Sequence, residues 1–304
     1  MYRVVSRCIA ALALFFALAG AVYALEDPPL VYTETVELTG IENLSISYGP
    51  DRVILRESET SDLVIKEYMS RDKPRYYARI SRLGDAVQIR RGKRPLLFQW
   101  NWYARAEIYI PRSFRGNLRL SNSSGSLSGD ADLLDFKSVD INVGSGAVSL
   151  NRVSGGSVSV HVSSGELDVD ALAGNSFISV SSGSLRIGGL TGEENRVKVS
   201  SGRLQIGSLT GEENRIEISA GRLRIGALEG HGIFDISSGN IAVDRVRGTV
   251  DVDISSGGLE LGDFSGGGNF EINSGNLKLD LRTLEEDLRF KLSSGSANVT
   301  IPGA

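Results

Sequence analysis

The chain has 304 residues, a formal net charge of −4 and 41% hydrophobic residues, which is enough apolar material for a sizeable core. A single cysteine, Cys8, excludes a scaffold held by intramolecular disulfides, so the core and its hydrogen bonds must hold the fold. The charge is uneven, because residues 62–115 contain 13 cations and 5 anions. Such a basic block attracts anionic polymers or lipid head groups, or else neutralises acidic neighbours within the fold.

The N-terminus predicts a secretory signal peptide, residues 1–24. Arg3 and Arg7 precede an apolar run, and a signal-peptidase-like site ends at Ala24. The apolar run is shorter than the ~20 residues of a comfortable membrane span, and an uncleaved anchor is the alternative interpretation. We therefore expect an exported protein, whether periplasmic, cell-surface or secreted, with no transmembrane segment after cleavage.

Residues 25–115 predict a β-rich N-terminal cap region. Segments such as "NLSISYG", "DRVILRE" and "RAEIYIP" alternate apolar and polar residues, and the turns between them carry Gly, Pro, Asp and Asn. A stack of strands needs its end covered, because a bare end exposes apolar surface and unpaired backbone.

One stretch of this region, "RRGKRPLLFQWNWYARAEIYIP", combines cations with both tryptophans of the protein. Basic and aromatic side chains together bind anionic ligands by charge and by ring contact. The stretch predicts a ligand-binding patch for an anionic envelope glycan, lipid head groups or a surface protein, and the export signal argues against nucleic acid. The alternative is a strand whose aromatic face covers the core, with the basic run in a hairpin loop. The candidate residues are Arg90, Arg91, Lys93, Arg94, Trp100, Trp102 and Tyr103.

From residue 116 to 304 the sequence repeats itself with a period of 18–21 residues. Self-similarity at such a period is typical of stacked architectures, because one unit is too small to bury its own apolar face. We therefore predict an all-β fold, a parallel β-helix or β-solenoid of about ten coils. The corner glycines that define the repeat are Gly125, Gly146, Gly165, Gly183, Gly202, Gly221, Gly239, Gly257, Gly275 and Gly295.

Each repeat predicts two short strands with one buried face. In the unit around Gly202, Val197 and Val199 alternate with polar residues before the corner, and Leu204 and Ile206 do so after it. The seven prolines all lie outside residues 113–300, as a continuous ladder of strands requires. We expect these aliphatic side chains to fill the interior.

The residue before the corner glycine is serine in nine of the ten repeats. A catalytic serine is needed once, beside one base, so a serine in every coil indicates a structural role. We expect the glycine to adopt positive φ and the serine to fit the tight inside of the corner. The two histidines fall in different coils, and the sequence assigns no catalytic, cofactor-binding or metal-binding residue.

The ten "SSG"-type corners, entered through "AEIYIPRSFRGNLRLSNSSGSL", resemble a bacterial family of β-strand-repeat proteins labelled putative adhesins, a domain of unknown function. The resemblance extends from about Val36 to Pro302. It implies a parallel β-helix in an exported or envelope protein, and it brings no catalytic residues.

Two functional hypotheses follow. The first is a non-enzymatic solenoid of the cell envelope or exterior that acts in adhesion, binding, scaffolding or envelope sensing. The second is a carbohydrate-active β-helix enzyme, a polysaccharide lyase or hydrolase. The first is favoured because the turns differ by only two or three residues, which leaves no insertions to build a catalytic cleft.

Overall fold

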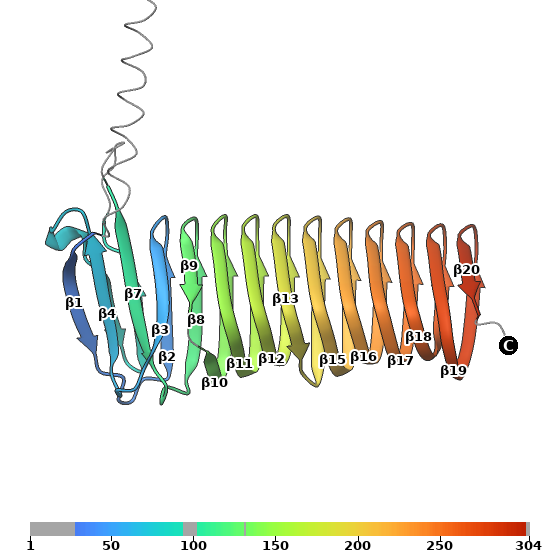
Figure 1. The fold of residues 1–304 in the computed structure, drawn as a ribbon, viewed down its shortest axis with the longest axis horizontal. Coiled ribbons are helices and arrows are strands. Elements are labelled where there is room, and N and C mark those ends of the chain that lie inside the picture. Colours follow the sequence, from blue (N-terminus) through green and yellow to red (C-terminus); the bar gives the residue numbers. More distant parts are fainter. Residues whose placement is uncertain (1–27, 94–101, 131, 302–304) are drawn as a thin grey trace, which may run out of the picture.

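The computed structural model describes residues 28–93, 102–130 and 132–301. The predicted signal peptide, Arg94 and Trp100 lie outside these residues. The described residues contain no α-helix, one short 3-10 helix and twenty strands that pair into one continuous sheet. Figure 1 shows the strands as a row of stacked coils, with the N-terminal strands at one end.

The elements, in chain order, are β1 Leu30–Val36, β2 Asn43–Tyr48, β3 Arg52–Ser58, β4 Leu63–Met69, η1 Pro74–Tyr76, β5 Arg79–Leu83, β6 Ala86–Arg90, β7 Ala104–Pro111, β8 Asn117–Asn122, β9 Ser126–Gly129, β10 Leu133–Val143, β11 Ala147–Val162, β12 Glu166–Val180, β13 Ser184–Thr191, β14 Glu194–Val199, β15 Arg203–Ile218, β16 Arg222–Ile236, β17 Asn240–Ile254, β18 Gly258–Ile272, β19 Asn276–Leu292 and β20 Ser296–Thr300.

From β8 to β20 the pairing is parallel, and each residue lies beside the residue one repeat away. Leu185, for example, is in register with Leu204, which in turn is in register with Leu223. This pattern is the predicted β-solenoid of about ten coils, and the predicted fold class is confirmed.

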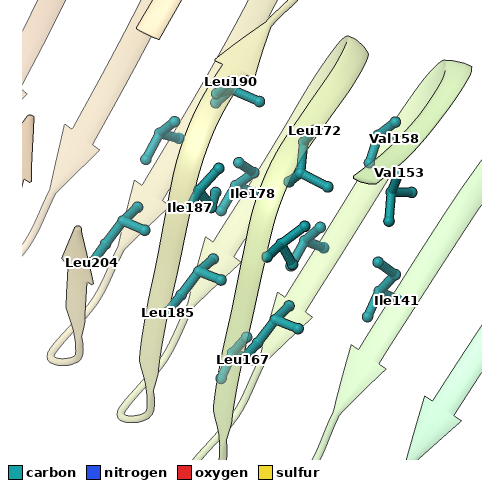
Figure 2. Packing of buried hydrophobic residues seen from close by; sticks show 14 of the residues in the cluster. Ile141, Val153, Val158, Leu167, Leu172, Ile178, Leu185, Ile187, Leu190 and Leu204 are labelled. Carbon is teal, nitrogen blue, oxygen red and sulfur yellow. The ribbon is translucent and has the colours of Figure 1, made fainter. Parts of the chain in front are cut away.

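The interior is a continuous column of aliphatic side chains. Val197 and Val199 are fully buried, and Leu204 and Ile206 are each 1% exposed, which confirms the predicted inward face. Figure 2 shows equivalent side chains, among them Leu185, pointing into the space enclosed by the coils. Residues of the same kind stack in successive coils, so each coil repeats the packing arrangement of the coil before it.

At the repeated corners the structure differs from the sequence-based prediction in two ways. Positive φ was expected at these ten positions, and this prediction is wrong, because none of them has a positive φ. Glycine is required instead because a side chain at this position would collide with the backbone of the preceding coil. A Cβ on Gly202 would lie 2.6 Å from the carbonyl oxygen of Gly183, and every later corner glycine meets its predecessor in the same way. Ser201 points outward and is exposed, so the serine does not fill the inside of the corner.

Positive φ occurs in a second glycine column, on the far side of the coil. Gly174, Gly230, Gly248 and Gly266 have φ between 104° and 153°, and a Cβ on each would approach the carbonyl oxygen one coil back to 2.3 Å or less. These positions require glycine for both conformation and space. Gly192 and Gly211, which follow Thr191 and Thr210, belong to the same column without a positive φ, and a Cβ on them would lie 2.4 and 2.5 Å from the carbonyl oxygen one coil back.

The same corner contains two buried asparagines. Asn195 and Asn214 are 2% and 0% exposed, and Asn195 Nδ2 donates to Asn214 Oδ1 at 2.9 Å. Asn214 Nδ2 donates to the carbonyl oxygens of Gly211, Glu229 and His231. The amides thus satisfy backbone carbonyls that the turn leaves without partners.

Parallel stacking extends into the region that the sequence assigns to the cap. The coil formed by β2 and β3 pairs with β8 and β9 on one side, and with β6 and β7 on the other. Beyond it, β4 pairs with β7, β1 with β4, and β5 with β6, all antiparallel. These antiparallel strands end the stack of coils.

If a Cβ at the corner glycine collides with the preceding coil, Gly202→Ala should destabilise the protein by about 1–3 kcal/mol. The backbone of the preceding coil cannot move aside without breaking the hydrogen-bonded ladder. Ser201→Ala is the matched control, with an expected change within about 0.5 kcal/mol. Ala220 already occupies the equivalent place one coil later. Urea unfolding of both variants is the measurement, and equal stabilities would contradict the interpretation.

Asn214→Ala is expected to destabilise the protein by about 1–3 kcal/mol, because it removes a buried amide and leaves its carbonyl partners unsatisfied. The control is Asn240→Ala, an exposed asparagine at the start of β17. Thermal unfolding compares the two, and an Asn214 variant as stable as the control would show that the buried amide is dispensable.

Candidate functional site

The basic run that the sequence singled out lies at the capped end of the solenoid. Arg90 is exposed at the end of β6, and Arg91 and Lys93 follow it. Gly92 allows this segment to run against the backbone of η1, since a Cβ there would lie 2.3 Å from the carbonyl oxygens of Tyr76 and Tyr77. The amide of Lys93 donates to the carbonyl oxygen of Arg75 at 3.0 Å, which ties the two segments together.

This contact brings a second basic segment to the patch, which the sequence analysis missed. Arg71, Lys73 and Arg75 surround η1 and are exposed. They lie about twenty residues before the predicted run, so only the strand pairing places them beside it. The available signal was the stretch "SRDKPRYY", which has three cations in five residues followed by two tyrosines.

The aromatic residues of the patch both pack and remain accessible. The Trp102 ring contacts the buried Tyr76 edge-on, with ring centroids 4.8 Å apart, and its side chain is half-buried. Tyr103 is 45% exposed, and its backbone exchanges hydrogen bonds with Ser70. Trp102 therefore packs against a buried ring at the capped end, and Tyr103 presents its ring to solvent.

The surroundings of the Tyr76 hydroxyl are cationic, whereas a hydrogen bond to Asp72 raises the pKa of the neighbouring Tyr77. The hydrogen bond from Arg75 Nη2 to the Tyr76 hydroxyl, 2.7 Å long, and the neighbouring charges of Lys73 and Arg71 lower the pKa of Tyr76. Among the described residues, no carboxylate lies within 4.0 Å of five exposed or half-buried cations of the patch. These are Arg71, Lys73, Arg75, Arg90 and Arg91.

Other cations near the capped end are paired within the fold. Arg105 of the basic block and Arg56, which precedes the block, lie 3.7 and 3.6 Å from Glu107, which is 7% exposed and also accepts hydrogen bonds from the hydroxyls of Tyr68 and Tyr109. The block thus contains cations that pair with carboxylates and cations around η1 and the end of β6 that lie at the surface. We call the second group, together with two aromatic residues beside it, the cap patch: Arg71, Lys73, Arg75, Arg90, Arg91, Lys93, Trp102 and Tyr103.

Two further features bear on chemistry. The structure holds no group of three His, Cys, Asp or Glu side chains able to bind a metal ion within its described ranges. Over the same ranges, no helix is long and apolar enough to cross a membrane.

Comparison with known proteins matches the C-terminal coils to a family. Residues 234–304 match the family model described as Toastrack DUF4097. The resemblance to a domain-of-unknown-function adhesin family is therefore confirmed over this segment. The DUF4097 segment begins in β16 and includes the last coils, β17 to β20. No curated protein matches the chain.

Solved structures with similar chains come from bacteria. A "putative lipid binding protein" from Parabacteroides distasonis is 14% identical with a TM-score of 0.39, covering 89% of this chain and 96% of its own. A "putative adhesin" from the same species is 15% identical with a TM-score of 0.36, covering 90% and 98%. A "putative cell adhesion protein" from Clostridium sporogenes is 11% identical with a TM-score of 0.32, covering 90% and 99%. At these TM-scores, the architecture rests on the strand pairing of this chain alone.

Tyrosines beside the cap patch predict a loss of stability at alkaline pH. Burial and a 2.8 Å hydrogen bond from its hydroxyl to Glu34 raise the pKa of Tyr32 to about 12, above its value of about 10 in the unfolded chain. The folded state therefore holds this proton more tightly, and the stability it contributes is complete below pH ~10 and lost as the pH rises toward 12.

The measurement is urea unfolding across this pH range, with tyrosinate absorbance recorded in parallel. Tyr32→Phe should lose less stability over the range than the parent does. Tyr103→Phe, which changes an exposed ring, is the control and should follow the parent. Identical pH profiles for the Tyr32 variant and the parent would show that its hydroxyl is not held by the fold.

Proposed function

We propose that this chain is an exported, non-enzymatic, adhesin-like solenoid that attaches through its cap patch to an anionic component of the cell envelope. The observation that carries the proposal is the convergence of two basic segments, 71–75 and 90–93, with accessible aromatic rings at one end of a rigid stack. Cations attract an anionic surface at long range, and tyrosine and tryptophan rings suit the boundary of a lipid or glycan layer.

The position of the patch fits an end-on attachment. The coils from β8 to β20 extend from the cap as one continuous ladder, as Figure 1 shows, so a contact at the cap leaves them free along their length. The printed descriptions of the similar solved structures, a putative cell adhesion protein and a putative lipid binding protein, agree with a binding role. The signal-like N-terminus supports export.

No observation favours the carbohydrate-active enzyme. A groove along the coils is lined mainly by the serines and glycines of the repeated corners and not by inserted loops. Serine recurs at this corner in nine of the ten repeats, whereas a catalytic serine is needed once, beside one base.

The test replaces four of the exposed cations of the cap patch, Arg71, Lys73, Arg75 and Arg90, with Ser. Binding is measured to vesicles containing phosphatidylglycerol, to neutral phosphatidylcholine vesicles and to isolated envelopes, at low and high salt. We expect the parent to bind the anionic surfaces and the variant to lose at least about tenfold in affinity, since four cations near a surface each contribute about 1 kcal/mol. Added salt should weaken the binding of the parent.

The control removes the same charge from the coils, with Arg119, Arg152, Arg224 and Arg282 replaced by Ser. Each of these pairs with an aspartate one coil away. A folded cap variant that binds as the parent does, or a control that loses as much affinity, would overturn the proposal. Tyr103→Ala separately tests the contribution of the exposed ring.

A further inference from the structure

Outward cations on the coils are mostly paired with carboxylates, and three arginines are exceptions. Most cations from β8 to β20 lie within 4.0 Å of a carboxylate, usually one coil away, as in Lys278 with Glu260 and Lys291 with Glu271. On the described residues of these coils, three arginines have no carboxylate at that distance: Arg203, Arg222 and Arg247.

Arg203 and Arg222 differ from Arg247 because they lie directly beside each other. They are in-register partners at the first positions of β15 and β16, so their Cα atoms are about 5 Å apart across the ladder. Arg247 is in register with the acidic Glu229 and the neutral Ser265 instead. Two like charges at adjacent rungs repel each other, which an anion bound between them would relieve.

The adjacent positions of their column supply no counter-charge. The neighbour before Arg203 is Ser184, and the neighbour after Arg222 is Asn240. The first carboxylate in the column, Glu166, lies two coils before Arg203, at roughly 10 Å. The positions around the pair therefore offer hydrogen-bonding groups and no acid.

The arginine pair also lines the corner groove. This groove runs along the coils and is lined by corner residues from Ser124 to Asn240, including Arg203 and Arg222 and, two coils before Arg203, Glu166. The corner glycines line it too, and they carry no side chain because of the close approach of successive coils. Ser182 and Ser201, both exposed, line the same groove.

We propose that the corner groove binds a linear, carboxylated glycan, with Arg203 and Arg222 holding its carboxylates. Guanidinium groups bind carboxylates through paired, charge-assisted hydrogen bonds. A groove that is open, polar and continuous across several coils suits an extended polymer, and serine hydroxyls match sugar hydroxyls. This site lies on the coils and is distinct from the cap patch.

The test uses the mature chain with polygalacturonate as the probe and neutral dextran as its uncharged counterpart. The double variant Arg203→Ser with Arg222→Asn takes the residues of the adjacent coils, Ser184 and Asn240, so the ladder and the corner are retained. We expect the parent to bind polygalacturonate and not dextran. The variant should lose at least about tenfold in affinity, because charge-assisted hydrogen bonds from both arginines are removed.

The matched control is Arg245→Ser with Arg247→Ser, which removes the same net charge from the coils away from the groove. It should bind within about twofold of the parent, the ordinary effect of an exposed substitution. The four-cation cap variant should likewise retain polygalacturonate binding, and phosphatidylglycerol vesicles should bind the Arg203/Arg222 variant as they bind the parent.

Four outcomes would overturn the inference: a parent that does not bind polygalacturonate, an Arg203/Arg222 variant that binds it unchanged, an equal loss in the Arg245/Arg247 control, or a loss confined to vesicles. Circular dichroism and unfolding midpoints confirm that each variant is folded. If the double variant does not fold, the single variants Arg203→Ser and Arg222→Asn replace it in the binding measurements.

Discussion

The close approach of successive coils at their corners is the constraint on which the structure depends. The amide of Ser201 donates to the carbonyl oxygen of Ser181 at 2.7 Å, and the same bond recurs from coil to coil. At this spacing the inner corner position has no room for a Cβ, so glycine is required there in every coil. A change at one corner therefore disturbs both neighbouring coils. The register of each coil thus depends on the register of the coils beside it.

The fixed register also determines the surface. Because equivalent residues lie one rung apart, each outward position becomes a column of side chains running along the stack. Most columns balance their charges across rungs, as Arg224 does with Asp244. The column that contains Arg203 and Arg222 does not balance its charges at these two positions. We propose that a bound ligand supplies the missing negative charge there.

The strands at the capped end pair differently from those of the coils. There the chain abandons parallel stacking for antiparallel strands, and loops from distant parts of the sequence meet. Glu107 is buried and balanced by Arg56 and Arg105, while the cations around η1 and the end of β6 face solvent. Exposed cations thus lie at the capped end, around η1 and the end of β6, and on the coils, at Arg203 and Arg222.

The sequence alone determined the repeat, the inward face and the number of coils, because these depend on local alternation and on a period that the glycines mark. Val199 and Leu204 were assignable to the core because a strand has only two faces. Only the tertiary structure decided the rest. The reason for glycine at Gly202 is a neighbouring coil, which no local propensity reveals. The place of Arg75 beside Lys93, and the pairing of β2 with β8, depend on long-range strand order. The isolation of Arg203 and Arg222 depends on which side chains the register sets beside them, since a charge pattern read along the chain does not show what lies one coil away.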